Sequence, residues 1–139
     1  MALKGPVIIV EDDPNDAEVI VAAIKEIGIP NEARVMNKAE EAYDYLHTTK
    51  EQPFLILCDI RMPQTDGLAL RDRIMKNEYL RKKSIPFIFF TGMVSQDIIN
   101  TAYDLEVQGF YQKAFSYQGI KDQLLAIFIY WKHSLHPNT

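Results

Sequence analysis

The fold is decided by the stretch Pro53-Phe54-Leu55-Ile56-Leu57-Cys58-Asp59-Ile60-Arg61-Met62-Pro63-Gln64-Thr65-Asp66-Gly67. Its apolar first half is too short to span a membrane and has no outward polar face, which is typical of a strand buried on both sides of a parallel sheet. Pro63 and Gly67 then mark a loop. Asp59 is therefore expected at the carboxyl end of a central strand, where open α/β sheets place their ligand sites.

Strand and helix patterns alternate along the rest of the chain. Four further short strands are expected at 6–10, 32–36, 87–91 and 109–113, the second of them weak. Helical spacing of apolar residues and capping residues predict five helices at 15–27, 37–47, 67–77, 95–105 and 116–131. Five strand-then-helix units without a repeat or a linker predict an α/β fold with one parallel sheet covered on both faces.

Length and composition predict a single domain. The chain has 139 residues, of which 47% are hydrophobic, and this is enough for one core and leaves little room for a second. We expect one domain over 1–139, with its core at about 6–133 and a frayed tail at 134–139.

Charge and motif content exclude several classes of protein. The net charge of −4 gives no sequence-wide attraction to nucleic acid or to anionic lipid. Cys58 is the one cysteine, and no Cys/His set has zinc-ligand spacing, which fits a reducing compartment. No signal peptide begins the chain, and no apolar run reaches the roughly 18 residues of a transmembrane helix. We expect a soluble, cytoplasmic protein without direct contact to nucleic acid or membrane.

Polar residues follow four of the expected strands. The loops that follow the strands of a doubly wound sheet gather along one edge, which would bring together Glu11-Asp12-Asp13, Asp59, Thr91-Gly92 and Lys113. Carboxylates this close repel, so the site must protonate one of them, disperse them or bind a cation. For Asp13, a simple helix cap that stabilises the helix N-terminus is an open alternative.

Magnesium is the cation that fits this set. It prefers oxygen ligands and typically takes one or two carboxylates together with a phosphate oxygen. Asp12 and Asp59 are expected as direct ligands and Glu11 as a ligand through water. Beside such a metal, an aspartate can attack a phosphoryl group and form an aspartyl-phosphate.

The other polar residues suit the same chemistry. Lys113 supplies a second cation, Thr91 supplies a hydroxyl donor, and Gly92 lets its backbone N–H approach a phosphate oxygen closely. No residue stands out as a general base for fast turnover.

The chain resembles the receiver domain of two-component response regulators, the CheY-like family. The resemblance covers essentially the whole chain and rests on four motifs in the family's order and spacing. They are Ile8-Ile9-Val10-Glu11-Asp12-Asp13, Asp59-Ile60-Arg61-Met62-Pro63-Gln64-Thr65-Asp66-Gly67, Phe90-Thr91-Gly92 and Gly109-Phe110-Tyr111-Gln112-Lys113. The resemblance implies a flavodoxin-like doubly wound sheet of five parallel strands, (βα)5, with the strand order 2-1-3-4-5.

The resemblance also implies roles for the acidic residues. Asp59 matches the phosphoacceptor, which takes a phosphoryl group from a phosphohistidine of a sensor histidine kinase or phosphotransfer protein and requires Mg²⁺. Glu11 and Asp12 match the acidic metal pair, and Arg61 matches the residue that lends its backbone carbonyl to the metal.

A conformational signal is implied as well. Thr91 and Lys113 match the residues that report phosphorylation, and Phe110 matches the switch aromatic. Capture of the phosphate by Thr91 would let Phe110 turn inward and reshape the face formed by the last two helices and the strand between them.

These implications make the chain a stand-alone phosphoacceptor with an unknown downstream protein target, or one that passes its phosphate onward. It is not expected to be an enzyme beyond slow self-dephosphorylation, for which Arg61 and Met93 would adjust water access. The last helix is apolar nearly all round at 127–131, so a homodimer through this helix or through the signalling face is a further expectation.

One residue departs from the family pattern. The family usually has a proline after the lysine, often through a cis peptide bond, and this chain has Ala114. A cis bond before a residue other than proline costs about 2.5–4 kcal/mol, so the bond before Ala114 is either trans or cis and held by its surroundings. The lysine is present, so we expect function to survive.

Three other interpretations stay open at this point. A pseudo-receiver would act as an interaction module without phosphorylation. A magnesium phosphohydrolase of the haloacid-dehalogenase type would need a second aspartate at the position of Arg61, and a flavodoxin-like nucleotide binder would need a glycine-rich loop after Val10. The basic residues of the third helix and of the stretch that follows it are expected to form a solvated helix face with its extension: Arg71, Arg73, Lys76, Arg81, Lys82 and Lys83.

Overall fold

The computed structural model describes residues 2–62 and 64–138, so that Pro63 of the expected loop lies outside the described part. Its centre is a five-stranded sheet made of β1 (Val7–Val10), β2 (Ala33–Met36), β3 (Leu55–Cys58), β4 (Phe87–Thr91) and β5 (Gly109–Gln112). All neighbouring strands are parallel and their order is β2-β1-β3-β4-β5. The expected doubly wound sheet is confirmed.

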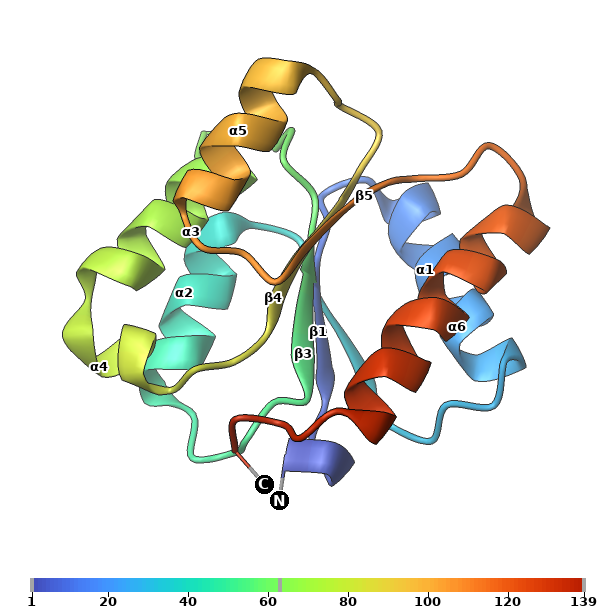
Figure 1. Ribbon diagram of the computed structural model, residues 1–139, viewed down its shortest axis with the longest axis horizontal. Coiled ribbons are helices and arrows are strands. Elements are labelled where there is room, and N and C mark those ends of the chain that lie inside the picture. Colours follow the sequence, from blue (N-terminus) through green and yellow to red (C-terminus); the bar gives the residue numbers. More distant parts are fainter. Residues whose placement is uncertain (1, 63, 139) are drawn as a thin grey trace.

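Helices cover both faces of this sheet. They are a short 3₁₀ turn at Ala2–Lys4, α1 (Pro14–Glu26), α2 (Ala39–Thr48), α3 (Gly67–Lys76), α4 (Glu78–Lys82), α5 (Gln96–Asp104) and α6 (Tyr117–His133). Helices α1 and α6 lie on one face, and α2, α3, α4 and α5 lie on the other (Figure 1). Among the described residues, no helix is long and apolar enough to cross a membrane.

Two helix boundaries differ from the sequence-based expectation. The polar stretch after α3 forms a separate helix, because Asn77 is extended (φ −97°, ψ 111°) and its side chain accepts a hydrogen bond from the Leu80 N–H to cap α4. Helix α2 begins at Ala39, and Asn37 is not its N-cap. The Glu41 carboxylate instead accepts from the Asn37 N–H at 3.1 Å.

Alternate residues of the three central strands feed two separate cores, as parallel strands buried on both faces do. The core under α2 to α5 takes Ile8, Val10, Ile56, Cys58, Phe87 and Phe89. The core under α1 and α6 takes Val7, Ile9, Leu55, Leu57, Ile88 and Phe90. Because both faces of β1, β3 and β4 are covered, their ends cannot shift without disturbing two cores at once.

Residues 134–138, after α6, pack against the domain, which corrects the expectation of a frayed tail for this described part. The His136 ring is 2% exposed and lies 5.8 Å from the Phe54 ring and 5.9 Å from the Trp131 ring. Its Nδ1 accepts from the Asn138 backbone N–H at 3.0 Å, so Nε2 carries the proton and donates to the Phe54 carbonyl at 2.6 Å. The Asn138 side chain donates to the Lys83 carbonyl at 2.6 Å. A buried ring and its hydrogen bonds therefore hold this segment.

Arg71 is buried, which corrects its assignment to a solvated helix face. It is 6% exposed because it follows Leu70 on the side of α3 that faces the sheet. Its Nε donates to the Leu105 carbonyl at 3.0 Å and its Nη2 to the Glu106 carbonyl at 2.9 Å. The guanidinium carbon lies 5.1 Å from the centre of the Phe87 ring. Three members of the expected face, Lys76, Arg81 and Lys82, are exposed.

Candidate functional site

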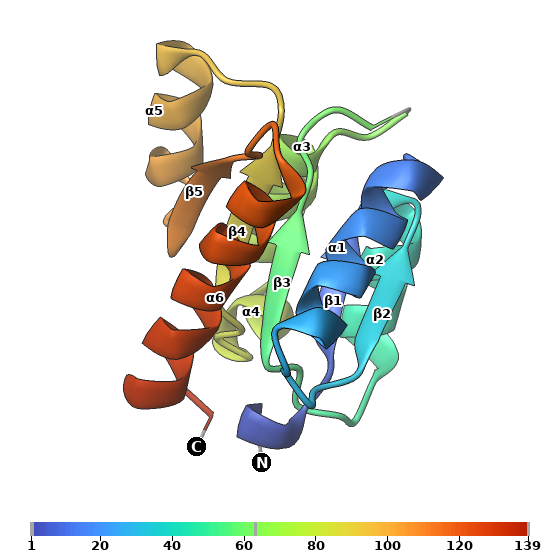
Figure 2. The same cartoon turned by 90° about the vertical axis from the view of Figure 1, so that its right-hand side faces the viewer.

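The carboxyl ends of four strands meet at one edge of the sheet, which points upward in Figure 2, with both chain termini at the other edge. At the ends of β1 and β3, one more backbone hydrogen bond holds the residue that directly follows the strand. The Glu11 N–H donates to the Met36 carbonyl at 3.0 Å and the Asp59 N–H donates to the Val10 carbonyl at 2.9 Å. The sheet itself thus determines where these two backbones lie.

Three carboxylates gather where β1 and β3 end. Glu11, Asp12 and Asp59 each offer one carboxylate oxygen, and these atoms lie within 4.8 Å of one another. Asp13 is turned away as the N-cap of α1, and its side chain accepts from the Asn15 and Asp16 N–H groups at 2.8 and 3.2 Å. The cap interpretation of Asp13 agrees with this geometry.

Lys113 lies beside the carboxylates at the end of β5. Its backbone N–H donates to the Thr91 carbonyl at 2.8 Å. Its Nζ lies 2.5 Å from a Glu11 carboxylate oxygen, 3.1 Å from an Asp16 oxygen and 3.9 Å from Asp59 Oδ2. One cation therefore faces three acidic side chains, which come from the ends of β1 and β3 and from α1.

Burial controls the charge state of Glu11. The side chain is 1% exposed, and this burial raises the pKa of Glu11 to about 7, against the lowering effect of Lys113 and with a further raising effect of Asp59. Burial is the largest single influence on Lys113 and opposes its charge, but the hydrogen bonds and charges of Glu11, Asp59 and Asp16 together outweigh it and raise the pKa of Lys113. The pair is a buried ionic contact at the floor of the site.

The two oxygens of Asp59 have different surroundings. Oδ1 accepts a hydrogen bond from the Ile60 N–H at 2.8 Å, whereas Oδ2 faces Lys113. Gly67, the first residue of α3, packs directly behind: a Cβ added there would lie 2.2 Å from the Asp59 carbonyl oxygen. Only glycine lets α3 begin this close to the end of β3.

Thr91 ends β4 and is fully buried. Its hydroxyl oxygen accepts from the Met93 N–H at 3.1 Å and so holds the loop that leads to α5. Space beside Gly92 is open, because a Cβ added there would meet no atom within 4 Å. Phe110 does not line the site; it is half-buried on β5, with its ring 5.9 Å from that of Phe89.

These residues surround one open cavity of about 880 Å³. Every residue that the sequence suggested for metal binding or phosphoryl chemistry lines it: Glu11, Asp12, Asp59, Arg61, Thr91, Gly92 and Lys113. The donor set fits a hard divalent cation, since it offers carboxylate oxygens and a neighbouring cation that limits their repulsion. The arrangement can hold a metal and a phosphoryl group side by side.

The peptide bond between Lys113 and Ala114 is trans, as are all the others between described residues. The sequence left a trans and a cis bond before Ala114 open, and the structure has the trans bond.

A comparison with known protein families identifies the family of this chain. The model of the response regulator receiver domain matches residues 7–125. The chain belongs to this family. It is thus a receiver domain of two-component signalling, a class of protein that accepts phosphoryl groups and binds a divalent metal in an acidic pocket.

Relatives of this receiver domain differ in length. The probable methanogenesis regulatory protein FilR2 of Methanothrix harundinacea (strain 6Ac) is 28% identical over 129 residues, which are 90% of this chain and 82% of that protein. The DNA-binding transcriptional regulator NtrC of Proteus hauseri is 29% identical over 137 residues, 98% of this chain but 27% of that protein. The receiver domain thus occurs both in short regulators and as one part of long ones.

A solved structure agrees with the fold. The phosphorylated cyanobacterial phytochrome response regulator RcpA is 25% identical, and the match covers 95% of this chain and 96% of that chain with a TM-score of 0.84. Its five-stranded architecture is therefore shared along nearly the whole length of this receiver domain.

Sequence reasoning missed three residues that shape the site. Asp16 lies in the first turn of α1 and pairs with Lys113. The one feature of the sequence that could have indicated this role is its position four residues after Asp12. Gly67 was seen as a loop marker, not as the glycine that admits α3 behind Asp59. Gln123 on α6 binds the backbone beside Lys113, and no sequence pattern reveals this contact.

Proposed function

We propose that this receiver domain is a stand-alone response regulator that accepts a phosphoryl group onto Asp59 in a Mg²⁺-dependent reaction. The donor is a phosphohistidine of a sensor histidine kinase or of a phosphotransfer protein. One observation carries the proposal: Asp59, 11% exposed, has the carboxylates of Glu11 and Asp12 on one side and Lys113 Nζ 3.9 Å away on the other. The length of FilR2 supports the stand-alone form.

The surroundings of Asp59 favour one oxygen as the nucleophile. Oδ1 is held by the Ile60 N–H, so Oδ2 attacks phosphorus. An O–P bond forms while the P–N bond to the donor histidine breaks, and its electron pair returns to the imidazole, which is then protonated. Lys113 pairs with the charge that builds on the phosphoryl oxygens. A Mg²⁺ ion held by Asp12, Asp59 and the Arg61 carbonyl, with Glu11 acting through water, would offset the same charge.

The proposed signal starts at Thr91. Its hydroxyl binds the Met93 N–H, so a turn of Thr91 toward a phosphoryl group breaks this contact and frees the loop before α5. Phe110 on the neighbouring strand then turns inward and changes the face formed by α5, β5 and α6. A local change of charge would in this way alter a surface some distance from Asp59.

That face offers apolar contacts to a partner. Its exposed large side chains include Tyr103 and Tyr130, and Leu125 and Ile129 are exposed elsewhere on α6. We propose that it binds the downstream target and that it, or α6 alone, forms a homodimer on phosphorylation. Light scattering with and without a phosphate mimic tests the dimer, and a monomer in both states removes it.

We expect no catalytic turnover of phosphorylated substrates beyond slow self-dephosphorylation. Arg61 lies at the cavity where a phosphohydrolase of this chemistry would need an acidic residue. We propose the cytoplasm as the place of action, because phosphohistidine kinases present their donor groups there.

Treatment with acetyl phosphate and Mg²⁺, followed by intact mass measurement, tests the site. The chain is expected to gain one phosphoryl group, Asp59→Asn to gain none, and the surface control Asp72→Asn to behave as the parent chain. A phosphoryl group on Asp59→Asn would overturn the choice of acceptor. A parent chain that stays unmodified, and also takes nothing from sensor kinases, would favour the pseudo-receiver.

A further inference from the structure

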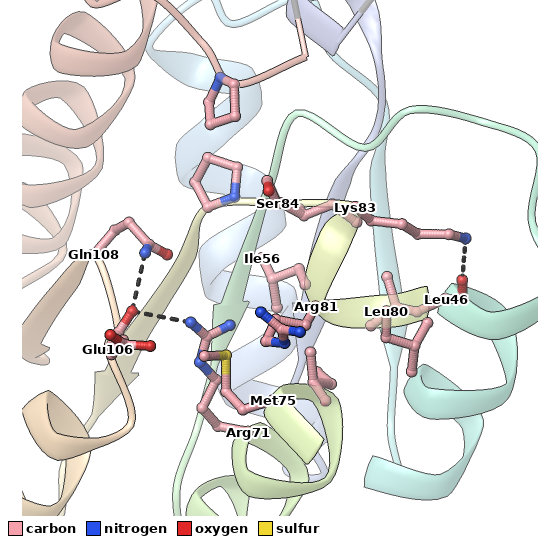
Figure 3. Close-up of a pocket in the computed structure, with 14 residues that line it drawn as sticks. Leu46, Ile56, Arg71, Met75, Leu80, Arg81, Lys83, Ser84, Glu106 and Gln108 are labelled. Atoms are coloured by element: carbon pink, nitrogen blue, oxygen red, sulfur yellow. Dashed lines mark hydrogen bonds between the residues drawn. The ribbon is translucent and has the colours of Figure 1, made fainter. Parts of the chain in front are cut away.

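A second cavity lies at the opposite edge of the sheet, where β3, β4 and β5 begin (Figure 3). Its volume of about 330 Å³ lies at the lower end of the range for small-molecule sites. About half of its wall is apolar, and this part includes Leu46, Ile56, Ile74, Met75, Leu80 and Ile85. None of these residues takes part in the site around Asp59.

The buried arginine Arg71 lies in this wall, and Glu106 is the acidic residue whose charge acts on it. Its Nε and Nη2 bind the carbonyls of Leu105 and Glu106, and within the described chain no carboxylate lies within 4.0 Å of its guanidinium group. Nη1 has no acceptor among the described side chains and backbone. No fully buried side-chain nitrogen lacks a partner there, so Nη1 keeps accessible surface and faces the cavity.

An unpaired buried charge is unusual in a folded protein, since charges removed from water are normally paired with ions of opposite sign. Burial lowers the pKa of Arg71 to about 10, so the group stays charged at neutral pH. Two neutral carbonyls and the Phe87 ring hold the guanidinium group in place. The charge of Glu106 acts on Arg71 from beyond 4.0 Å and offsets its burial only in part. A bound anion would provide a close partner.

A second guanidinium group faces the same cavity from α4. Arg81 is exposed, and its side chain makes no hydrogen bond or ion pair with the described residues (Figure 3). Lys83 also lines the cavity, with its Nζ bound to the carbonyls of Leu46 and Thr49. Glu106 is the one acidic residue among the lining groups. Three cations against one carboxylate favour an anionic ligand.

We propose that this cavity binds a small organic carboxylate with an apolar body. Its carboxylate would lie between Arg71 and Arg81, because a planar guanidinium fork matches the two oxygens of a carboxylate. Its hydrocarbon part would lie against the apolar wall. A more strongly hydrated anion such as inorganic phosphate gains nothing from that wall. The binding needs neither Mg²⁺ nor a phosphorylated Asp59 and does not rest on the proposed function.

Amide chemical shifts of the full chain, titrated with phenylacetate, test this site. We expect saturable shifts at Leu105, Glu106 and Gln108 with a dissociation constant on the order of 1 mM, as is usual for a ligand of this size. Phenylacetamide has the same shape without the charge, and losing the charged hydrogen bonds should weaken its binding by about tenfold. Asp59→Asn is expected to bind phenylacetate as the parent chain does.

Two variants on one helix decide the role of the charge. Arg81→Gln removes the exposed guanidinium and should weaken phenylacetate binding several-fold, whereas Lys82→Gln, next to it but outside the cavity, should not. Neither side chain is buried, so both variants should fold. Equal effects of the two substitutions, equal affinity for phenylacetate and phenylacetamide, or an equally strong response to inorganic phosphate would each overturn the proposal. So would shifts confined to the surroundings of Asp59.

Discussion

Gln123 accepts a hydrogen bond from the backbone N–H of Ala114 at 3.0 Å, and its side-chain nitrogen donates to the Gln112 carbonyl at 2.6 Å. One side chain of α6 thus holds the backbone on both sides of Lys113. A proline after the lysine, the usual residue of the family, has no N–H to donate to Gln123. In this chain, a side-chain clamp takes the place of a rigid ring beside the lysine.

Replacing Gln123 with methionine keeps its length and removes both hydrogen bonds. We expect the free energy of unfolding to fall by about 1–2 kcal/mol, because the part-buried Ala114 N–H and the exposed Gln112 carbonyl both lose their partner. Phosphorylation of Asp59 should slow by about tenfold, since displacing a reacting group by ~1 Å can cost about 100-fold. Chemical denaturation and the initial rate with acetyl phosphate measure the two effects.

A control on the same helix is Gln118→Met, because Gln118 is exposed and its side chain binds only Asp122 among the described residues. This variant should leave stability and rate within error of the parent chain. If both methionine variants behaved alike, Gln123 would not position Lys113.

Gly67→Ala should disturb the site from behind. The new Cβ would meet the backbone of Asp59, with 2.2 Å to its carbonyl oxygen, and neither backbone can give way easily. Forced overpacking of this kind costs about 1–3 kcal/mol, and the shift of Asp59 should also slow its phosphorylation. Thermal unfolding is the first readout. Gly92→Ala, which enters open space, should leave the melting temperature unchanged, and a similar loss in both variants would contradict the argument.

The central strands and their polar ends could be predicted from the sequence. Strands buried on both faces need continuous apolar runs, and 55–58 and 87–90 are such runs, so their position and parallel pairing follow. A carboxylate or lysine directly after a strand must then lie at the edge of the sheet where the carboxyl ends of the strands meet. The grouping of Glu11, Asp59 and Lys113 is therefore a consequence of topology.

Contacts between elements could not be predicted in the same way. Arginine is a residue type usually found at the surface. The orientation of α3 nevertheless directs the Arg71 side chain toward the backbone carbonyls that follow α5. Asn77 looks like any polar residue within a helix, and its extended backbone is what separates α3 from α4. These outcomes depend on distances between segments far apart in the chain, which local periodicity does not contain.

His136→Ala tests the packed tail, which was expected to be frayed because chain termini are often poorly ordered. The change removes ring contacts to Phe54 and Trp131 and the hydrogen bond to the Phe54 carbonyl. We expect a loss of about 2–3 kcal/mol in the free energy of unfolding, as for other large-to-small changes at buried positions. His133→Ala, on the exposed last turn of α6, should cost less than about 0.5 kcal/mol. A tail that contributes nothing would make the two variants equal.

The pH dependence of metal binding tests the buried Glu11. Its pKa is raised from 4.5 to about 7, so between these values the folded chain holds a proton that the unfolded chain has released. The stability that this proton provides is present below pH 4.5 and is lost as the pH rises through about 7. A divalent cation needs the ionised carboxylate, so its binding should strengthen over the same rise in pH.

Calorimetric titration with Mg²⁺ should therefore give a dissociation constant about tenfold weaker near pH 6 than near pH 8, because the ionised fraction of Glu11 changes by about that factor. Titrations in two buffers with different heats of ionisation should show release of a proton near pH 6 and little release near pH 8. Glu11→Gln removes the titrating group, so its weaker binding should change little with pH. Equal pH profiles in the parent chain and in this variant would mean that Glu11 is already ionised beside Lys113 and that the ion pair outweighs its burial.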